Sequence, residues 1–317
     1  MSRSFIERIE DLPVPILPTF VGALTLSNVF NNLGFSWVRH GTMWIATIIW
    51  LVYLMKIIKY PKKFRTEYSN TVLSSLYAGF TMIMMILGSY YVQYNKVLGK
   101  GLWAVGLAIH AIHLIIFTYR NLIKNFNKDT FVPSWYVSYN GIMVSVVVSG
   151  SMNEPLIAKI ITYYGIGIYL LILPFMIYRL ATVEINPPVY HTQAILLAPA
   201  SLCVVSYLTA IENPNTVLLG LLYILALCSL AFLLYKIPKF FSIDFTPAYA
   251  GMTFPMAIGI VASLQMSNYT GKLGYEQLSA VIKQIAGIQF YVTTAIIGYV
   301  LIQFLIMGLG TKKKATN

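Results

Sequence analysis

The stretch YAGMTFPMAIG, Tyr249 to Gly259, decides the fold class of this chain. It lies within an apolar run of membrane-spanning length, and it places the bulky Phe254 directly before the helix breaker Pro255. Pro255 has no amide hydrogen, so the carbonyl of Gly251 loses its helical partner. Free backbone groups at membrane depth are tolerated only where they are packed in protein or face a water-filled cavity. The stretch therefore indicates a broken membrane-spanning helix, with a packing kink and a pore lining as its two explanations.

The composition of the whole chain places it among membrane proteins. Of its 317 residues, 58% are hydrophobic and only 10% are charged, whereas soluble domains carry about 25% charged residues. Apolar runs of spanning length recur along the chain, with the charges between them. We predict an all-α polytopic membrane protein, one transmembrane domain over residues 1–317, with ten transmembrane helices at 14–35, 40–58, 70–93, 101–120, 134–152, 157–179, 190–210, 216–235, 246–267 and 284–309.

The basic residues predict how the chain is oriented in the membrane. A cytoplasmic N-terminus places 16 of the 22 Lys and Arg residues on the cytoplasmic side. The six on the other side are Arg39, Lys96, Lys100, Lys159, Lys272 and Lys283. Because basic residues favour the cytoplasmic side, both termini are expected there. The net charge of +12 then reflects topology rather than binding of nucleic acid.

An internal repeat underlies the ten spans. Similar openings occur at PTFVG (18–22), PSWYV (133–137) and PAYAG (247–251), with SLYAG at 75–79. When Pro199 is aligned with Pro255, the five odd-numbered spans start at Pro18, Ser75, Pro133, His191 and Pro247, at intervals of 57, 58, 58 and 56 residues. These intervals predict five helical-hairpin repeats with pseudo-five-fold symmetry, in which the odd helices form an inner pore-lining ring. The repeats cover approximately 14–60, 70–120, 133–180, 190–236 and 246–309.

The repeat also predicts which side chains meet at the pore. Four residues after the starts lie the glycines Gly22, Gly79 and Gly251, and eight residues after them lie the helix breakers Gly141, Pro199 and Pro255. Seven residues after the starts, the repeat places Thr25, Met82, Asn140, Ala198 and Phe254 at one level. We expect these residues to line the pore and Phe254 to plug it by sterics and dewetting. An aromatic ring that only packs, and an interhelical hydrogen bond by Asn140, stay open as alternatives.

The spans lack the groups on which coupled transport and catalysis depend. No Asp, Glu, Lys or Arg lies deep in any predicted span, and ion-coupled carriers usually keep a buried carboxylate. A passive conduit is therefore favoured. His110 and His113 share one face of the fourth span, as a proton relay or as polar packing. Ser149 and Ser151 are the only support for an intramembrane hydrolase. No enzyme activity, metal or other cofactor is expected.

Three segments carry a resemblance to a known family: PSWYVSYNGIMVSVVVSGS (133–151), AILLAPASLCVVSYL (194–208) and AYAGMTFPMAIGIVAS (248–263). The chain resembles the tellurite-resistance/dicarboxylate transporter (TDT) family, which includes bacterial TehA, plant slow-type anion channels, fungal sulfite exporters and yeast malate permeases. The resemblance implies a homotrimer with one pore per subunit, inner helices kinked by prolines, and Phe254 as the gate. Ile83 stands where other repeats carry a breaker, so the kinks are expected to be uneven.

The same resemblance implies a function. It implies an anion channel or uniporter for small inorganic or organic anions, in the plasma (inner) membrane of a bacterium. A proton-coupled C4-dicarboxylate carrier, or a sulfite or tellurite exporter of the same family, is the alternative. Accumulation against a gradient separates the two, because a passive channel forbids it.

Overall fold

The computed structural model describes residues 8–308, and within this range the chain forms helices and turns without a strand. The predicted all-α class is confirmed. Residue 309, the predicted end of the last span, and both chain termini lie outside the described residues. Eight helices are long and apolar enough to cross a membrane. They are α3 (Ser36–Lys59), α5 (Thr71–Tyr91), α6 with the turn after it (Lys96–Lys124), α9 (Pro155–Thr182), η5 with α10 (Pro187–Ala210), α11 (Thr216–Phe241), η6 with α12 (Pro247–Lys272) and α13 (Glu276–Gly308).

The two other predicted spans form shorter helices. The first is α2 (Ile16–Asn32), which has 17 residues. The span at 134–152 is divided among four short pieces: α7 (Trp135–Tyr139), η3 (Gly141–Met143), α8 (Val144–Val147) and η4 (Ser149–Ser151). Both segments are largely buried. By length and composition the described residues therefore provide eight candidate spans, not ten.

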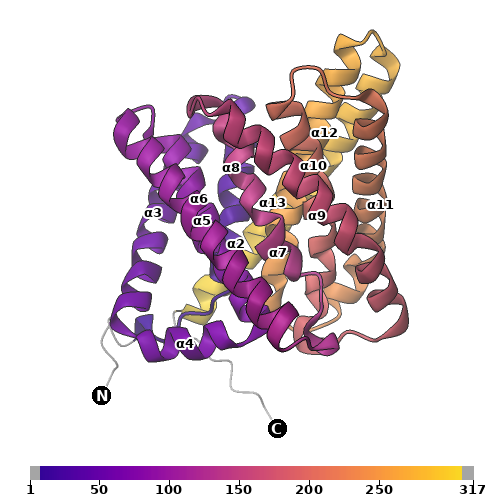
Figure 1. Cartoon of the computed structure of the whole chain (residues 1–317). Coiled ribbons are helices and arrows are strands. Elements are labelled where there is room, and N and C mark those ends of the chain that lie inside the picture. Colours follow the sequence, from indigo (N-terminus) through magenta and orange to yellow (C-terminus); the bar gives the residue numbers. More distant parts are fainter. Residues whose placement is uncertain (1–7, 309–317) are drawn as a thin grey trace.

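Five segments form a closed ring of contacts at the centre of the bundle (Figure 1). In chain order, α2 packs on α5, α5 on α7 and α8, α8 on α10, and α10 on α12, which packs back on α2. The apolar stretch of α5 is 83% buried, and those of η5–α10 and η6–α12 are 78% buried. These segments have almost no free face, so they constitute the core of the molecule.

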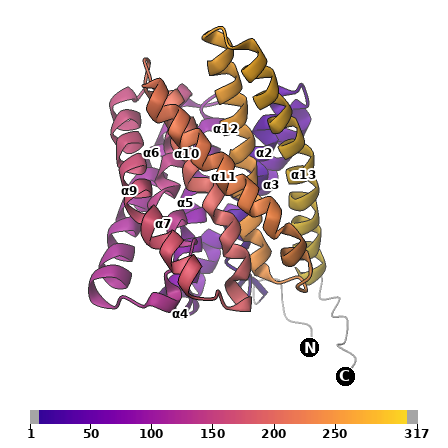
Figure 2. The same cartoon turned by 90° about the vertical axis from the view of Figure 1, so that its right-hand side faces the viewer.

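The other five long helices surround this ring. The apolar stretches of α3, α6, α9, α11 and α13 are only 22–33% buried. Figure 2 shows α11 and α13 running beside α10 and α12, and both pairs are in contact. Large apolar side chains face outward from these helices, among them Ile48, Phe175 and Leu305, which are each at least 60% exposed. Such a surface suits lipid, since contiguous apolar patches of this extent are rare on soluble monomers.

Helix type changes within two of the central segments. The 3-10 helix η5 (Pro187–Leu196) becomes α10 (Leu197–Ala210), and η6 (Pro247–Met252) becomes α12 (Thr253–Lys272). Pro199 and Pro255 are the third residues of α10 and α12, where an α-helix needs no amide donor. The two prolines therefore sit just after the change of helix type, in the first turn of a new α-helix. The sequence had predicted that they kink continuous helices; in the structure they follow a change of helix type instead.

The central segments differ in continuity. The helix α5 runs without interruption through Ile83, where the sequence lacks a breaker, and α2 is likewise continuous. In the third central segment, α7 ends before Asn140 and a short 3-10 turn starts at Gly141. Three of the five central segments thus change helix type along their length, and two are continuous α-helices.

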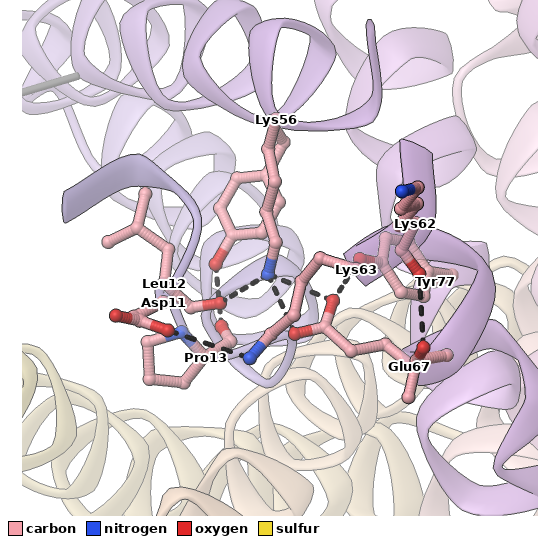
Figure 3. A network of polar contacts seen from close by, with 10 residues as sticks. Asp11, Leu12, Pro13, Lys56, Lys62, Lys63, Glu67 and Tyr77 are labelled. Carbon is pink, nitrogen blue, oxygen red and sulfur yellow. Dashed lines mark hydrogen bonds and ion pairs between the residues drawn. The ribbon is translucent and has the colours of Figure 1, made fainter. Parts of the chain in front are cut away.

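A buried ion pair fixes the short helix α4 (Pro61–Ser69), which lies across one end of the bundle (Figure 1). We call the end of the bundle at which α4 lies the α4 end, and the opposite end the far end. Lys56 is fully buried, and its Nζ lies 2.9 Å from both carboxylate oxygens of Glu67 and donates to the carbonyl of Leu12 at 2.8 Å. The Tyr77 hydroxyl donates to Glu67 at 2.6 Å (Figure 3). These contacts join the segment before α2 to α3, α4 and α5.

Candidate functional site

Three cavities follow one another through the central ring. The far vestibule, of about 780 Å³, lies among the far ends of α2, α5, α8 and α12. The α4 vestibule, of about 540 Å³, lies among the starts of α2, α5, η5 and η6. Between them is a constriction of about 20 Å³. A water molecule needs roughly 10–15 Å³ measured in this way, so the constriction has room for about one water.

The constriction has an apolar wall in which Tyr136 is the one residue with a polar side chain. Phe254 lines both the constriction and the far vestibule, and its side chain is 6% exposed. Four residues are shared with the α4 vestibule: Leu76, Ile195, Ala250 and Gly251. The three cavities are therefore contiguous through their lining, and Phe254 lies at the boundary on the far side.

Of the eleven residues that the sequence predicts to line the pore, seven line these cavities. Thr25 lines the far vestibule. The other six line the constriction: Met82, Gly141, Ala198, Gly251, Phe254 and Pro255. Ala198 and Phe254 are each the second residue of their α-helix. The repeat register thus brings together residues that are far apart in the chain.

The remaining four residues lie outside the three cavities and pack between segments. A Cβ atom on Gly22 would lie 2.7 Å from the nitrogen of Phe254, and one on Gly79 would lie 3.0 Å from the nitrogen of Pro18. Small residues at these points let the backbones approach closely. Pro199 is buried within α10.

Asn140 makes an interhelical hydrogen bond. Its Nδ2 donates to the carbonyl of Gly165 in α9 at 2.9 Å, and its side chain is fully buried. Of the two roles left open by the sequence, the structure shows this one. The bond connects the interrupted third segment to an outer helix at the point where α7 ends.

Sequence reasoning missed one residue of the far vestibule. Arg39, in the first turn of α3, is the one ionisable side chain among the residues that line this cavity. Its Nε donates to Oδ1 of Asn28 at 2.8 Å. The sequence analysis counted Arg39 only as a charge outside the membrane, because it began the second span at residue 40. The helix begins at Ser36, which brings Arg39 to the mouth of the cavity.

The two histidines of α6 are held at all four ring nitrogens. His110 bonds Thr81 Oγ1 at 2.7 Å and the Ser138 carbonyl at 3.0 Å. His113 bonds the Tyr68 hydroxyl at 2.6 Å and Ser138 Oγ at 3.0 Å. Burial raises the pKa of Tyr68 to about 12, so its phenol stays protonated at neutral pH. These hydrogen bonds join α6 to α4, α5 and α7.

The two candidate nucleophiles are not paired with these histidines. Ser149 donates its hydroxyl to the carbonyl of Val146 at 2.8 Å, and Ser151 lines the far vestibule. A serine nucleophile needs a base within hydrogen-bond reach. No such pair is formed by either serine within residues 8–308.

Comparison with known proteins identifies the family. The family model described as "Voltage-dependent anion channel" (SLAC1) matches residues 14–305. The chain belongs to this family. The resemblance to TDT transporters is thereby confirmed. A similar curated protein is an uncharacterized transporter, MJ0762, of Methanocaldococcus jannaschii, 28% identical over 143 residues. The match spans 41% of this chain and 42% of the length of that relative. The apolar helices and the family together make this SLAC1-family chain a multi-pass membrane protein of a transporter and channel class.

Proposed function

We propose that this chain is a passive anion channel or uniporter whose uncharged pore is closed by Phe254. One observation carries the proposal: Phe254 lines both the far vestibule of about 780 Å³ and the constriction of about 20 Å³, whose wall is almost wholly apolar. Hydrophobic constrictions of this kind gate by dewetting, because an ion loses its water without gaining a partner. The conformation then corresponds to a closed conduit.

The proposed architecture is ten membrane-spanning segments in five hairpins, with pseudo-five-fold symmetry and one domain. The closed ring of central contacts, surrounded by five half-exposed helices, supports it. We infer that α2 and the divided segment α7–α8 cross the membrane despite their short helices, because they complete the ring. Three such subunits would associate through part of the apolar outer surface, with lipid on the rest.

The proposed orientation places the α4 end and both termini in the cytoplasm of a bacterium, with the protein in the plasma (inner) membrane. Four basic residues support it, one at the end of α3 and three in α4: Lys59, Lys62, Lys63 and Arg65. Basic residues close to the ends of spans favour the cytoplasmic side and its anionic lipids. The far vestibule with Arg39 would then open outward.

The experiment is Phe254→Ala, measured in planar bilayers under a chloride gradient. Removal of the benzyl ring should raise anion conductance by about tenfold or more, since the apolar barrier is shortened and widened. The reversal potential should lie near that of chloride. Phe175→Ala is the matched control, because Phe175 is 62% exposed on α9 and faces away from the ring. A folded Phe254→Ala protein that stays as silent as the parent contradicts the gate.

A proton-coupled C4-dicarboxylate carrier, or a sulfite or tellurite exporter, is the second candidate. The hydrogen bonds between the Tyr68 hydroxyl and His113 and between His113 and the Ser138 hydroxyl favour it, because titratable and hydroxyl side chains joined in this way can pass protons. Proteoliposomes with an imposed pH gradient and membrane voltage held at zero distinguish the two. A channel equalises malate or sulfite across the membrane, whereas a coupled carrier accumulates or depletes it in step with the gradient.

A further inference from the structure

The far vestibule carries a positive charge that nothing in its wall neutralises. Arg39 is the one ionisable side chain in the wall, and the polar remainder consists of amides and hydroxyls such as those of Asn31, Gln93 and Gln265. Among residues 8–308, no ionisable side chain lines the α4 vestibule. The positive charge therefore lies on one side of the constriction, at the end where Phe254 is the boundary.

Two contacts hold the Arg39 guanidinium in place. Its Nε donates to Asn28 at 2.8 Å, and its central carbon lies 5.2 Å from the centre of the Tyr90 ring, which is fully buried. Within the described part of the chain, Arg39 makes no salt bridge, and Nε is its one hydrogen-bonding group. The two terminal amino groups are thus left as a pair of donors on an anchored cation.

We propose that Arg39 binds small oxyanions, such as nitrate, sulfite or a short carboxylate, in the far vestibule. A guanidinium presents two parallel N–H groups that match two oxygens of one anion, which a halide cannot use. The cavity, at about 780 Å³, holds such an anion together with water. This inference rests on the proposed function, because it assigns an anion-binding residue to the same pathway.

The first test measures conduction in the Phe254→Ala background at about 20 mM salt. A unit charge about 6 Å away raises the local anion concentration in water about threefold. Arg39→Gln should therefore lower the anion current that starts from the far end about threefold, and the difference should vanish at about 1 M salt, where the screening length is about 3 Å.

The conservative variant separates charge from geometry. Arg39→Lys keeps the charge and loses the fork, so it should restore the chloride current but not the preference for nitrate over chloride. Lys283→Gln removes an equal charge from an exposed position on α13 and should leave that preference unchanged. A nitrate preference that survives in Arg39→Gln or Arg39→Lys overturns the proposal.

The second test does not depend on conduction. Crystals of the parent protein grown with sodium selenite should show an anomalous selenium peak within hydrogen-bond reach of Arg39, and crystals of Arg39→Gln should not. Absence of the peak from the parent, or its persistence in Arg39→Gln, overturns the site. If Phe254→Ala is silent, the proposed function fails while selenite still decides whether Arg39 binds an oxyanion.

Discussion

Gly22 of α2 lies directly against the backbone of Phe254 in α12. A Cβ atom on Gly22 would lie 2.7 Å from the Phe254 nitrogen and 2.7 Å from the carbonyl carbon of Thr253. The Thr253 hydroxyl also lies 3.3 Å from the carbonyl of Pro18, which belongs to α2 like Gly22. The position of the proposed gate is thus set by the closest approach of two helices that are more than 200 residues apart in the chain.

Gly22→Ala should destabilise the protein and loosen the gate. The added methyl group meets backbone atoms that cannot rotate away, and overpacking of this kind costs about 1–3 kcal/mol. We expect a lower midpoint of thermal unfolding in detergent and a higher resting anion conductance. Gly287→Ala on α13 is the control, since nothing lies within 4 Å of its Cβ position. A Gly22→Ala protein as stable as that control would show that the helices do not touch here.

Ala198→Phe should close the pore that Phe254→Ala opens. Both residues line the constriction, and each is the second residue of its α-helix. A benzyl ring placed at the equivalent position of the neighbouring repeat should fill the space that the first one leaves. The double variant should return to about the parent conductance, within about twofold, because the apolar plug is restored. A double variant that conducts like Phe254→Ala argues against equivalence of the two repeats.

Asn140→Ala should reduce stability without changing selectivity. The variant removes one buried hydrogen bond to the Gly165 carbonyl, which keeps its contact with Cys203 Sγ, at a cost of about 0.5–1.5 kcal/mol. Unfolding in detergent measures this loss. In the Phe254→Ala background, the nitrate-to-chloride conductance ratio should stay the same. A changed conductance ratio would indicate that the Asn140 side chain contacts the permeating anion.

The contributions of Lys56 and Glu67 to the stability of the protein should depend strongly on each other. Lys56→Met leaves the Glu67 carboxylate with the Tyr77 hydroxyl but no opposing charge, and Glu67→Gln leaves a buried ammonium without an opposing charge. Removing one partner of a buried pair costs about 3–5 kcal/mol, whereas removing both is often nearly neutral.

A double-mutant cycle in detergent measures this dependence, with the double variant expected to recover much of the loss. Lys63→Gln is the control, because Lys63 lies 3.5 Å from Asp11 in an exposed pair, and such pairs contribute about 1 kcal/mol or less. Additive losses for Lys56→Met and Glu67→Gln would contradict the contact.

The sequence predicted the long helices well because the membrane leaves few options. A chain in hydrocarbon must satisfy its backbone internally, so an apolar run such as 70–93 becomes a helix, observed as α5 (Thr71–Tyr91). Ala198 and Phe254, which the predicted repeat places at one level, are each the second residue of an α-helix.

The remaining features depend on contacts that spacing does not encode. A central helix is buried on every side, so periodicity does not tell which residues face the hole and which, like Gly22 and Gly79, face a neighbour. Lys56 was counted only among the cytoplasmic basic residues, because its partner Glu67 lies beyond the span and α4 must fold back for the two to meet. Arg39 was missed by a shift of four residues in the start of α3.

The 3-10 geometry of η5 and η6 makes two central segments uneven along their length. The hydrogen bonds of a 3-10 helix are poorer than those of an α-helix, so η5 and η6 deform at lower cost than α10 and α12. A pulling force along either segment would therefore stretch its 3-10 part first, and Phe254, the second residue of α12, lies beside the point where the helix type changes.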